Sequence, residues 1–179
     1  KEDPLLSLKG NNGHVAYLGY FNLALSYYRK VASNPKNEFI KLNDSITSSL
    51  VRRFETSKSC LLETYPGETY PVDNISALSS IALHNQITGS NHKILVERCL
   101  KKIEDKYIDK ISGFLVQSID LDTEMPIDKP RASGTALAAY FLSFSKPEIA
   151  KKFYLSLKKC STQWIGFGLV KEYPPNVTQ

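Results

Sequence analysis

Two kinds of apolar segment alternate along the chain. Residues 14–28, 74–87 and 134–144 carry apolar side chains nearly all round the circumference of a helix, and such a helix must be buried on most sides. The segment after each of these has one apolar stripe at helical spacing and lysines elsewhere, which predicts a half-exposed outer helix packed on a buried inner one. The stripes consist of Phe39, Leu42, Ile46, Leu50 and Phe54, then Leu95, Cys99, Ile103, Tyr107 and Ile111, then Ile149, Phe153 and Leu157.

Short turn signals join the two kinds of segment at a regular interval. They read SNPK at 33–36, TGSN at 88–91 and SFSKP at 143–147, and their centres lie 55 and 56 residues apart. A fixed period of this size is typical of a repeat architecture, and each unit has the pattern of a helical hairpin.

We therefore predict an all-α fold, an α/α toroid in which helical hairpins curl around an axis in two layers. The repeats are expected at about 13–57, 73–112 and 133–159 of a single domain, residues 1–179. A closed (α/α)6-type barrel would need six hairpins, about 330 residues at this repeat length. The chain thus supplies about half of a ring. The remainder is expected from the same protein or from another chain, a homo-oligomer being one such arrangement.

Composition narrows the function classes. The net charge of +5 comes from lysines that mostly alternate with acidic residues, which indicates solvated faces and no nucleic-acid partner. The three cysteines lie far apart in the sequence, without a CxxC motif or paired histidines. Neither a metal site nor a disulfide framework is expected from that spacing. No run of about 18 apolar residues is present to span a membrane.

The long loops between repeats carry the candidate chemistry. They cover about 58–72, 113–132 and 160–175 and should emerge at one end of the layers. They are rich in aromatic and acidic residues, and loops of this length in a compact domain are usually functional or disordered. An acidic mouth favours general acid/base chemistry or a small-molecule or carbohydrate-like ligand.

The first of these loops leads into the second inner segment with the sequence ETYPGETYPVDN, residues 63–74. Its two prolines fix φ and favour extended conformations for Tyr65 and Tyr70. Gly67 supplies the turn between them. We expect an ordered loop with Glu68 or Tyr70 facing the ring axis and with Asp73 starting the helix.

Three motifs resemble one known family. They are Gly-His before the first inner helix, Pro-Val-Asp-Asn at the second, and Glu-Tyr-Pro near residue 173. Together they resemble the α/α-toroid domain of the linalool dehydratase/isomerase-like family over most of residues 13–175. The resemblance implies an (α/α)6 barrel with a central active site that adds or removes water without a cofactor. Its catalytic cysteines would align with Tyr70 and Ser79, so the thiol acid/base pair is absent here.

The candidate site follows from the loop and the resemblance together. Glu68 or Asp73 is the expected general acid or base, assisted by His14 and Tyr70. The expected ligand-binding residues are Tyr65, Asn74, Arg131, Glu172 and Tyr173.

Each candidate also has a structural reading. Asp73 is a good helix cap, and His14 could bond to a loop carbonyl at a helix start. Arg131 could pair with a loop carboxylate, and Glu172 with Tyr173 could make a structural hydrogen bond.

Two functions remain open at this point. The first is a cofactor-independent hydrolase or lyase, which needs titratable groups whose environments separate their pKa values. The second is a non-catalytic module that binds a glycan or peptide, or serves as a scaffold. The family resemblance also favours a bacterial cell-envelope protein, exported or membrane-anchored.

Overall fold

The computed structural model describes residues 4–10 and 13–174 of the 179-residue chain. Six α-helices dominate it, with a short 3-10 helix before them and a two-stranded hairpin after them. Their bounds are η1 Pro4–Lys9, α1 Val15–Val31, α2 Asn37–Thr56, α3 Pro71–Thr88, α4 Lys93–Lys106, α5 Ala132–Ser143, α6 Pro147–Lys159, β1 Ser161–Trp164 and β2 Phe167–Val170.

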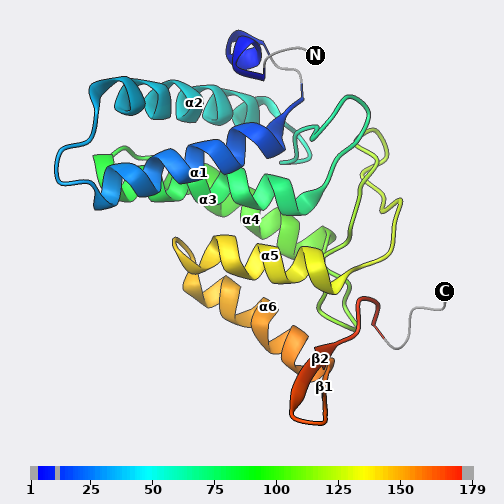
Figure 1. Cartoon of the computed structure of the whole chain (residues 1–179). Helices are drawn as coiled ribbons and strands as arrows, with labels where there is room; N and C mark the ends of the chain where they lie inside the picture. The colour runs from blue at the N-terminus through cyan, green and yellow to red at the C-terminus, as the bar shows by residue number, and fades with distance from the viewer. Residues whose placement is uncertain (1–3, 11–12, 175–179) are drawn as a thin grey trace.

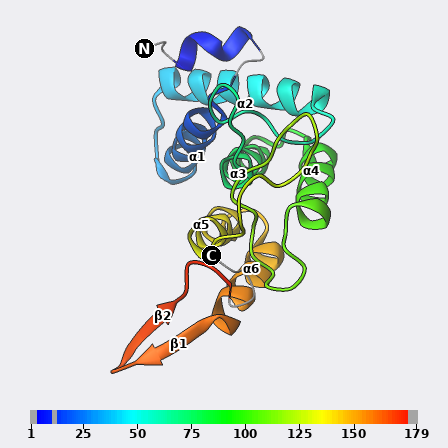
Figure 2. The same ribbon diagram turned by 90° about the vertical axis from the view of Figure 1, so that its right-hand side faces the viewer.

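The helices form three consecutive hairpins in two layers. Figure 1 shows α1, α3 and α5 running side by side, each joined by a short turn to its following partner α2, α4 or α6. Seen end-on in Figure 2, α2, α4 and α6 lie on the outside of an arc, and α1, α3 and α5 lie inside it. The predicted all-α fold of helical hairpins is confirmed. Closure of such hairpins into a ring stays a prediction.

The central inner helix, α3, is buried from Pro71 to His84 without interruption. Proline at its first position needs no hydrogen-bond partner for a backbone N–H. Gly89 ends the helix in a left-handed conformation, φ 75°. The helix therefore begins two residues before Asp73. Asp73 lies inside the first turn, so it is not the N-cap that the sequence predicts.

The α1–α3 contact depends on a glycine and on buried polar side chains. A Cβ atom added at Gly19 would lie 2.7 Å from Ser76 Oγ and 2.8 Å from Ala77 N, so only glycine allows this approach. Nearby, Asn22 Nδ2 donates to Thr47 Oγ1 at 3.0 Å and to Ser80 Oγ at 2.9 Å. One amide thus links α1 to both α2 and α3, in a core where unpaired polar groups are costly.

The inner helix α5 is less completely covered. Aromatic pairs hold it to α1, with Tyr20 and Phe141 ring centroids 5.2 Å apart and Tyr27 and Phe144 centroids 4.7 Å apart. The helix nevertheless leaves Leu137 and Tyr140 exposed. The third hairpin therefore has a neighbouring hairpin on one side only among the described residues.

Two local expectations were wrong. Helix α4 ends at Lys106, so Ile111 does not belong to its apolar stripe and is instead 78% exposed. The third long loop contains the antiparallel pair β1–β2, in which Ser161 pairs with Val170 and Trp164 with Phe167. Gly166 with φ 80° lies in the turn that closes this hairpin, and a glycine there satisfies the left-handed geometry of such turns.

The long loops meet at one end of the helices, as predicted. His14 N donates to Thr64 O at 3.0 Å, which ties the start of α1 to the first loop. Ile119 N donates to Thr69 O at 3.0 Å, which ties the second loop to the first. The third loop reaches the start of α5 through Ala132 N, which donates to the backbone oxygen of Glu172 at 2.8 Å.

Candidate functional site

The loop before α3 is a tight, hydrogen-bonded turn. Tyr65 N donates to Glu68 O at 3.3 Å, and Glu68 N donates to Tyr65 O at 2.9 Å. Pro66 and Gly67 occupy the corner, and Gly67 adopts φ 77°, the value that the second corner residue of a type II turn requires. The role predicted for Gly67 is confirmed. The turn leaves the Tyr65 and Glu68 side chains exposed to solvent.

Asp73 is the buried carboxylate of this region. It is 8% exposed and lies in the first turn of α3. Tyr20 Oη donates to its Oδ1 at 2.7 Å, and Thr64 Oγ1 donates to its Oδ2 at 3.1 Å. Three elements therefore converge on one carboxylate: α1, the loop and α3.

The environment of Asp73 favours its protonated form. Desolvation by burial raises the pKa of its carboxyl group, and the hydrogen bonds from Tyr20 and Thr64 only partly oppose this. Asp73 forms no ion pair within the described residues. The pKa of Tyr20 is also raised, by burial first and then by its hydrogen bond to Asp73. A carboxyl group that is protonated above its usual range can donate a proton as well as accept one.

Glu68 and Tyr70 form a second pair at the surface. Tyr70 Oη donates to Glu68 Oε2 at 2.6 Å. That hydrogen bond, with burial second, raises the pKa of Tyr70. Tyr70 is half-buried and also serves as the N-cap residue of α3, without a capping side-chain bond. The two carboxylates, Asp73 and Glu68, thus occupy a buried and a solvated environment on the same loop–helix junction.

His14 and Asn74 border the same junction. His14 precedes α1 with φ 63°, a left-handed conformation, and its side chain does not cap the helix. Asn74 is fully buried. Its amide accepts from Leu62 N at 2.7 Å and donates to Leu62 O at 3.0 Å and Tyr70 O at 3.1 Å. Asn74 therefore holds the loop in place, and these hydrogen bonds occupy its side-chain amide.

The remaining predicted residues gather at the start of α5. Arg131 pairs with Asp128 Oδ2 at 2.5 Å and lies 5.6 Å from the ring centroid of Tyr173. Glu172 accepts from Ser133 N at 3.1 Å and from Ser133 Oγ at 2.6 Å. These contacts agree with the structural readings of Arg131, as the partner of a loop carboxylate, and of Glu172, as a hydrogen-bonding residue. Among the described residues, none of these side chains hydrogen-bonds to the group around Asp73.

Tyr20 and Thr64 were missed by the sequence reasoning. Tyr20 lies in an apolar segment, where its ring counts toward the core. The available signal was its hydroxyl, because tyrosine combines an apolar ring with a polar end that usually finds a hydrogen-bond partner. Thr64 stands between the acidic and aromatic residues of the loop, and no periodic pattern distinguishes it.

Two of the three cysteines are in contact, although they are distant in sequence. A hydrogen bond from the Cys99 thiol, with the nearby Arg98 cation, lowers the pKa of Cys60 to about 6 in spite of desolvation. The same bond raises the pKa of Cys99. Both thiols are free and buried. Cys60 follows α2 and Cys99 lies in α4.

Metal and membrane features are absent from the part of the chain that the structure describes. Histidine, cysteine, aspartate and glutamate side chains of residues 4–10 and 13–174 do not gather in threes as metal ligands would. None of the helices formed by these residues combines the length and the apolar character that crossing a bilayer requires.

The fold and the site define an all-α domain of helical hairpins with a buried, hydrogen-bonded carboxylate beneath a stiff loop. Residues 13–167 match the family described as linalool dehydratase/isomerase. The match covers most of the chain and spans all three hairpins, and the chain belongs to this family. No curated protein matches the sequence.

Proposed function

We propose that the protein is a cofactor-independent enzyme of the lyase or hydrolase type, with Asp73 as its general acid or base. The observation that carries this proposal is the environment of Asp73: 8% exposure, two hydroxyl donors and a raised pKa. Keeping a carboxylate buried without a cation is costly. A carboxyl group perturbed by burial is a functional candidate because perturbed pKa values cluster at functional sites.

Family membership supports the reaction class. The family is described by the dehydration and isomerisation of linalool, an alcohol. Removing water from an alcohol requires a proton for the departing hydroxyl group and a base for the proton lost from carbon. A carboxyl group with a raised pKa fits the first role, since it keeps its proton closer to neutral pH.

The second proton-transfer group is proposed among the residues near Asp73. Tyr70 with Glu68 is one candidate, because the 2.6 Å hydrogen bond joins a phenol to a carboxylate on the same loop. His14 is the other, because its backbone hydrogen-bonds to that loop. Tyr20 is a positioning residue in this account: it orients Asp73 and tunes its pKa. An aromatic-lined cavity for a small-molecule or carbohydrate-like ligand at this end remains part of the proposal.

The test is turnover of alcohols, including linalool, by the full chain and three variants. Asp73→Asn keeps the size and the hydrogen-bond acceptor of the side chain but cannot transfer a proton, so turnover should fall by about 100-fold or more. Tyr20→Phe should lower activity less and should shift the pH profile. Asp120→Asn is the matched control, because Asp120 is a carboxylate of the second long loop that is bonded only within its own turn.

Equal turnover by wild type and Asp73→Asn would refute the role of Asp73. An equal loss in Asp120→Asn would show that the effect is not specific to the site. Saturable binding of a glycan or peptide without any turnover would favour the alternative function, a non-catalytic binding module.

A further inference from the structure

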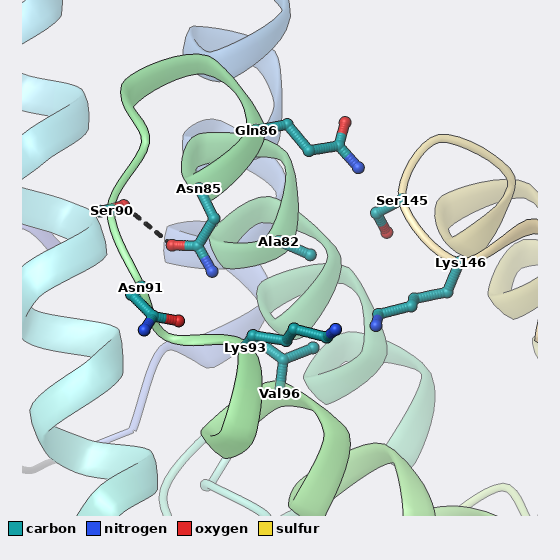
Figure 3. Close-up of a pocket in the computed structure, with 9 residues that line it drawn as sticks. All are labelled: Ala82, Asn85, Gln86, Ser90, Asn91, Lys93, Val96, Ser145 and Lys146. Carbon is teal, nitrogen blue, oxygen red and sulfur yellow. Dashed lines mark hydrogen bonds between the residues drawn. The ribbon is translucent and has the colours of Figure 1, made fainter.

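A pocket lies at the short-turn end of the helices, opposite the long loops. It has a volume of about 290 Å³ and lies where the α3–α4 turn faces the α5–α6 turn (Figure 3). Ala82 and Val96 are its apolar residues. Six polar residues that line it could contact a ligand: Asn85, Gln86, Asn91, Lys93, Ser145 and Lys146.

Two lysines give the pocket a positive character. Figure 3 shows the side chains of Lys93 and Lys146 extending toward one another from opposite walls. Both ammonium groups share one partner, Glu97 Oε1, at 3.9 Å from Lys93 Nζ and 3.2 Å from Lys146 Nζ. One carboxylate between two ammonium groups leaves a net positive charge.

Two helix starts reinforce this charge. Lys93 is the first residue of α4, and Lys146 is the N-cap residue of α6. Neither helix has a side-chain hydrogen bond at its cap. The partial positive charge of a helix N-terminus favours anions, and α4 and α6 both begin at this pocket.

A buried hydroxyl group in the wall lacks a partner. Ser145 is 9% exposed, and its Oγ has no hydrogen-bond partner. In Figure 3 this side chain points from the α5–α6 turn into the pocket. A buried hydroxyl without a hydrogen bond is destabilising, so its position here needs an explanation other than folding. A ligand atom within the pocket would supply the missing bond.

We propose that this pocket binds the oxyanion group, carboxylate or phosphate, of a small polar ligand. Lys146 and Lys93 provide the charge, and Ser145 Oγ donates a hydrogen bond to an anion oxygen. Gln86 and Asn91 offer uncharged hydrogen bonds to the rest of the ligand, while the Asn85 Oδ1 atom accepts from Ser90 at 2.8 Å. This site is separate from the acid/base site and does not depend on it.

Glu97 has a defined role in this proposal. Its carboxylate holds both lysines when the pocket is empty, so an incoming anion competes with it for the same ammonium groups. Removing the charge of Glu97 should therefore strengthen anion binding. A purely structural ion-pair cluster would show no such gain.

The experiment is a two-dimensional amide NMR titration of the full chain with inorganic phosphate and, separately, with acetate at constant ionic strength. Wild type should show saturable shifts confined to amides of residues 85–93 and 144–146. Lys146→Gln should weaken binding about tenfold, since a hydrogen bond to a charged group contributes this much to an equilibrium. Ser145→Ala should weaken it severalfold, and Glu97→Gln should strengthen it severalfold.

Lys101→Gln is the matched control, because Lys101 is an exposed lysine paired with Asp105 on α4, the helix that also carries Lys93 and Glu97. It should leave binding unchanged. The stronger of the two ligands identifies the anion as a phosphate or a carboxylate. The absence of saturable shifts with both ligands would overturn the proposal. Equal weakening by Lys101→Gln and Lys146→Gln would also overturn it, because it would indicate general charge screening.

Discussion

Helices α3 and α5 come from similar apolar sequences but lie in different surroundings. Helix α3 has α1 and α5 on its sides and α2 and α4 against it, and it is buried over fourteen consecutive residues. Helix α5 has its own partner α6, with α1 and α3 on one side, and it leaves Leu137 and Tyr140 exposed. An apolar inner helix is thus buried all round only when a hairpin packs on each of its sides. Within the described residues, α5 has a neighbouring hairpin on one side only.

The difference also extends to the first turn of each helix. At α3, the carboxylate Asp73 is buried and hydrogen-bonds to hydroxyl groups. At α5, the carboxylate Glu172 caps the helix by accepting from Ser133 N and Oγ. Burial of the Asp73 carboxylate opposes folding stability when it is ionised, whereas the hydrogen bonds of Glu172 stabilise the start of α5.

The largest expected effect compares one leucine from each helix. Leu78→Ala in α3 should lower the free energy of unfolding by about 2–5 kcal/mol, because it leaves a cavity in a closed core. Leu137→Ala in α5 should cost less than about 1 kcal/mol, since that side chain is 45% exposed. Urea denaturation measures both. Equal costs would show that α5 is covered in solution, as the predicted ring or homo-oligomer requires.

Two helical glycines give the next largest contrast. Gly19→Ala should lower the free energy of unfolding by about 1–3 kcal/mol, because the new methyl group meets the α3 backbone. At Gly134 in α5, an added Cβ would meet only Gln117 Oε1 at 3.3 Å, the end of a flexible side chain. Gly134→Ala should be neutral or stabilising, since alanine favours helices. A neutral Gly19→Ala would contradict the close α1–α3 packing.

Neutralising Asp73 and neutralising Glu172 should change the melting temperature in opposite directions. The pKa of Asp73 is raised in the folded state. Its contribution to stability is therefore complete below the unfolded pKa of about 3.9 and is lost as the pH rises through the folded value. Asp73→Asn should raise the melting temperature relative to wild type at pH 7, and this gain should vanish toward pH 3.

Glu172→Gln should lower the melting temperature at pH 7, because it weakens a helix cap. The expected loss in the free energy of unfolding is about 0.5–1 kcal/mol. Thermal melts of both variants across this pH range give the comparison. Destabilisation of similar size by both changes would mean that Asp73 is a structural residue like Glu172.

The smallest effect concerns the reactivity of the three thiols. Cys99 of α4 and its neighbour Cys60 are buried, whereas Cys160 at the end of α6 is partly exposed. Iodoacetamide should label Cys160 first in the native protein, even though Cys60 has the lowered pKa, because access limits the reaction. Mass spectrometry of peptides locates the label. Native labelling of Cys60 as fast as Cys160 would contradict the packing of α2 against α4.

The helices and their pairing could be predicted from the sequence because they depend on local periodicity. The apolar character of residues 74–87 marks α3 as a buried helix, and the TGSN turn marks its end, but its start at Pro71 lies two residues before the expected one. Residues 161–170 could not be assigned in this way. Their strands bury no face, so no alternation of apolar and polar residues indicated them.

The candidate site was predictable only on its loop side. The Pro66–Gly67 corner follows from residue chemistry, and Asp73 and Tyr70 stand next to it in the sequence. Tyr20 reaches Asp73 across 53 residues, and this contact depends on how closely α1 approaches α3 at Gly19. A tertiary distance of this kind leaves no signal in a single sequence.

The most direct test of the central claim is the carboxyl pKa of Asp73, measured by ¹³C NMR titration with Asp73→Asn to assign the signal. Asp120 is the internal reference, because hydrogen bonds from Thr123 lower its pKa. We predict that Asp73 titrates above the usual value of about 3.9 and that Asp120 titrates below it. A pKa for Asp73 at or below the usual value would contradict its assignment as the acid/base group.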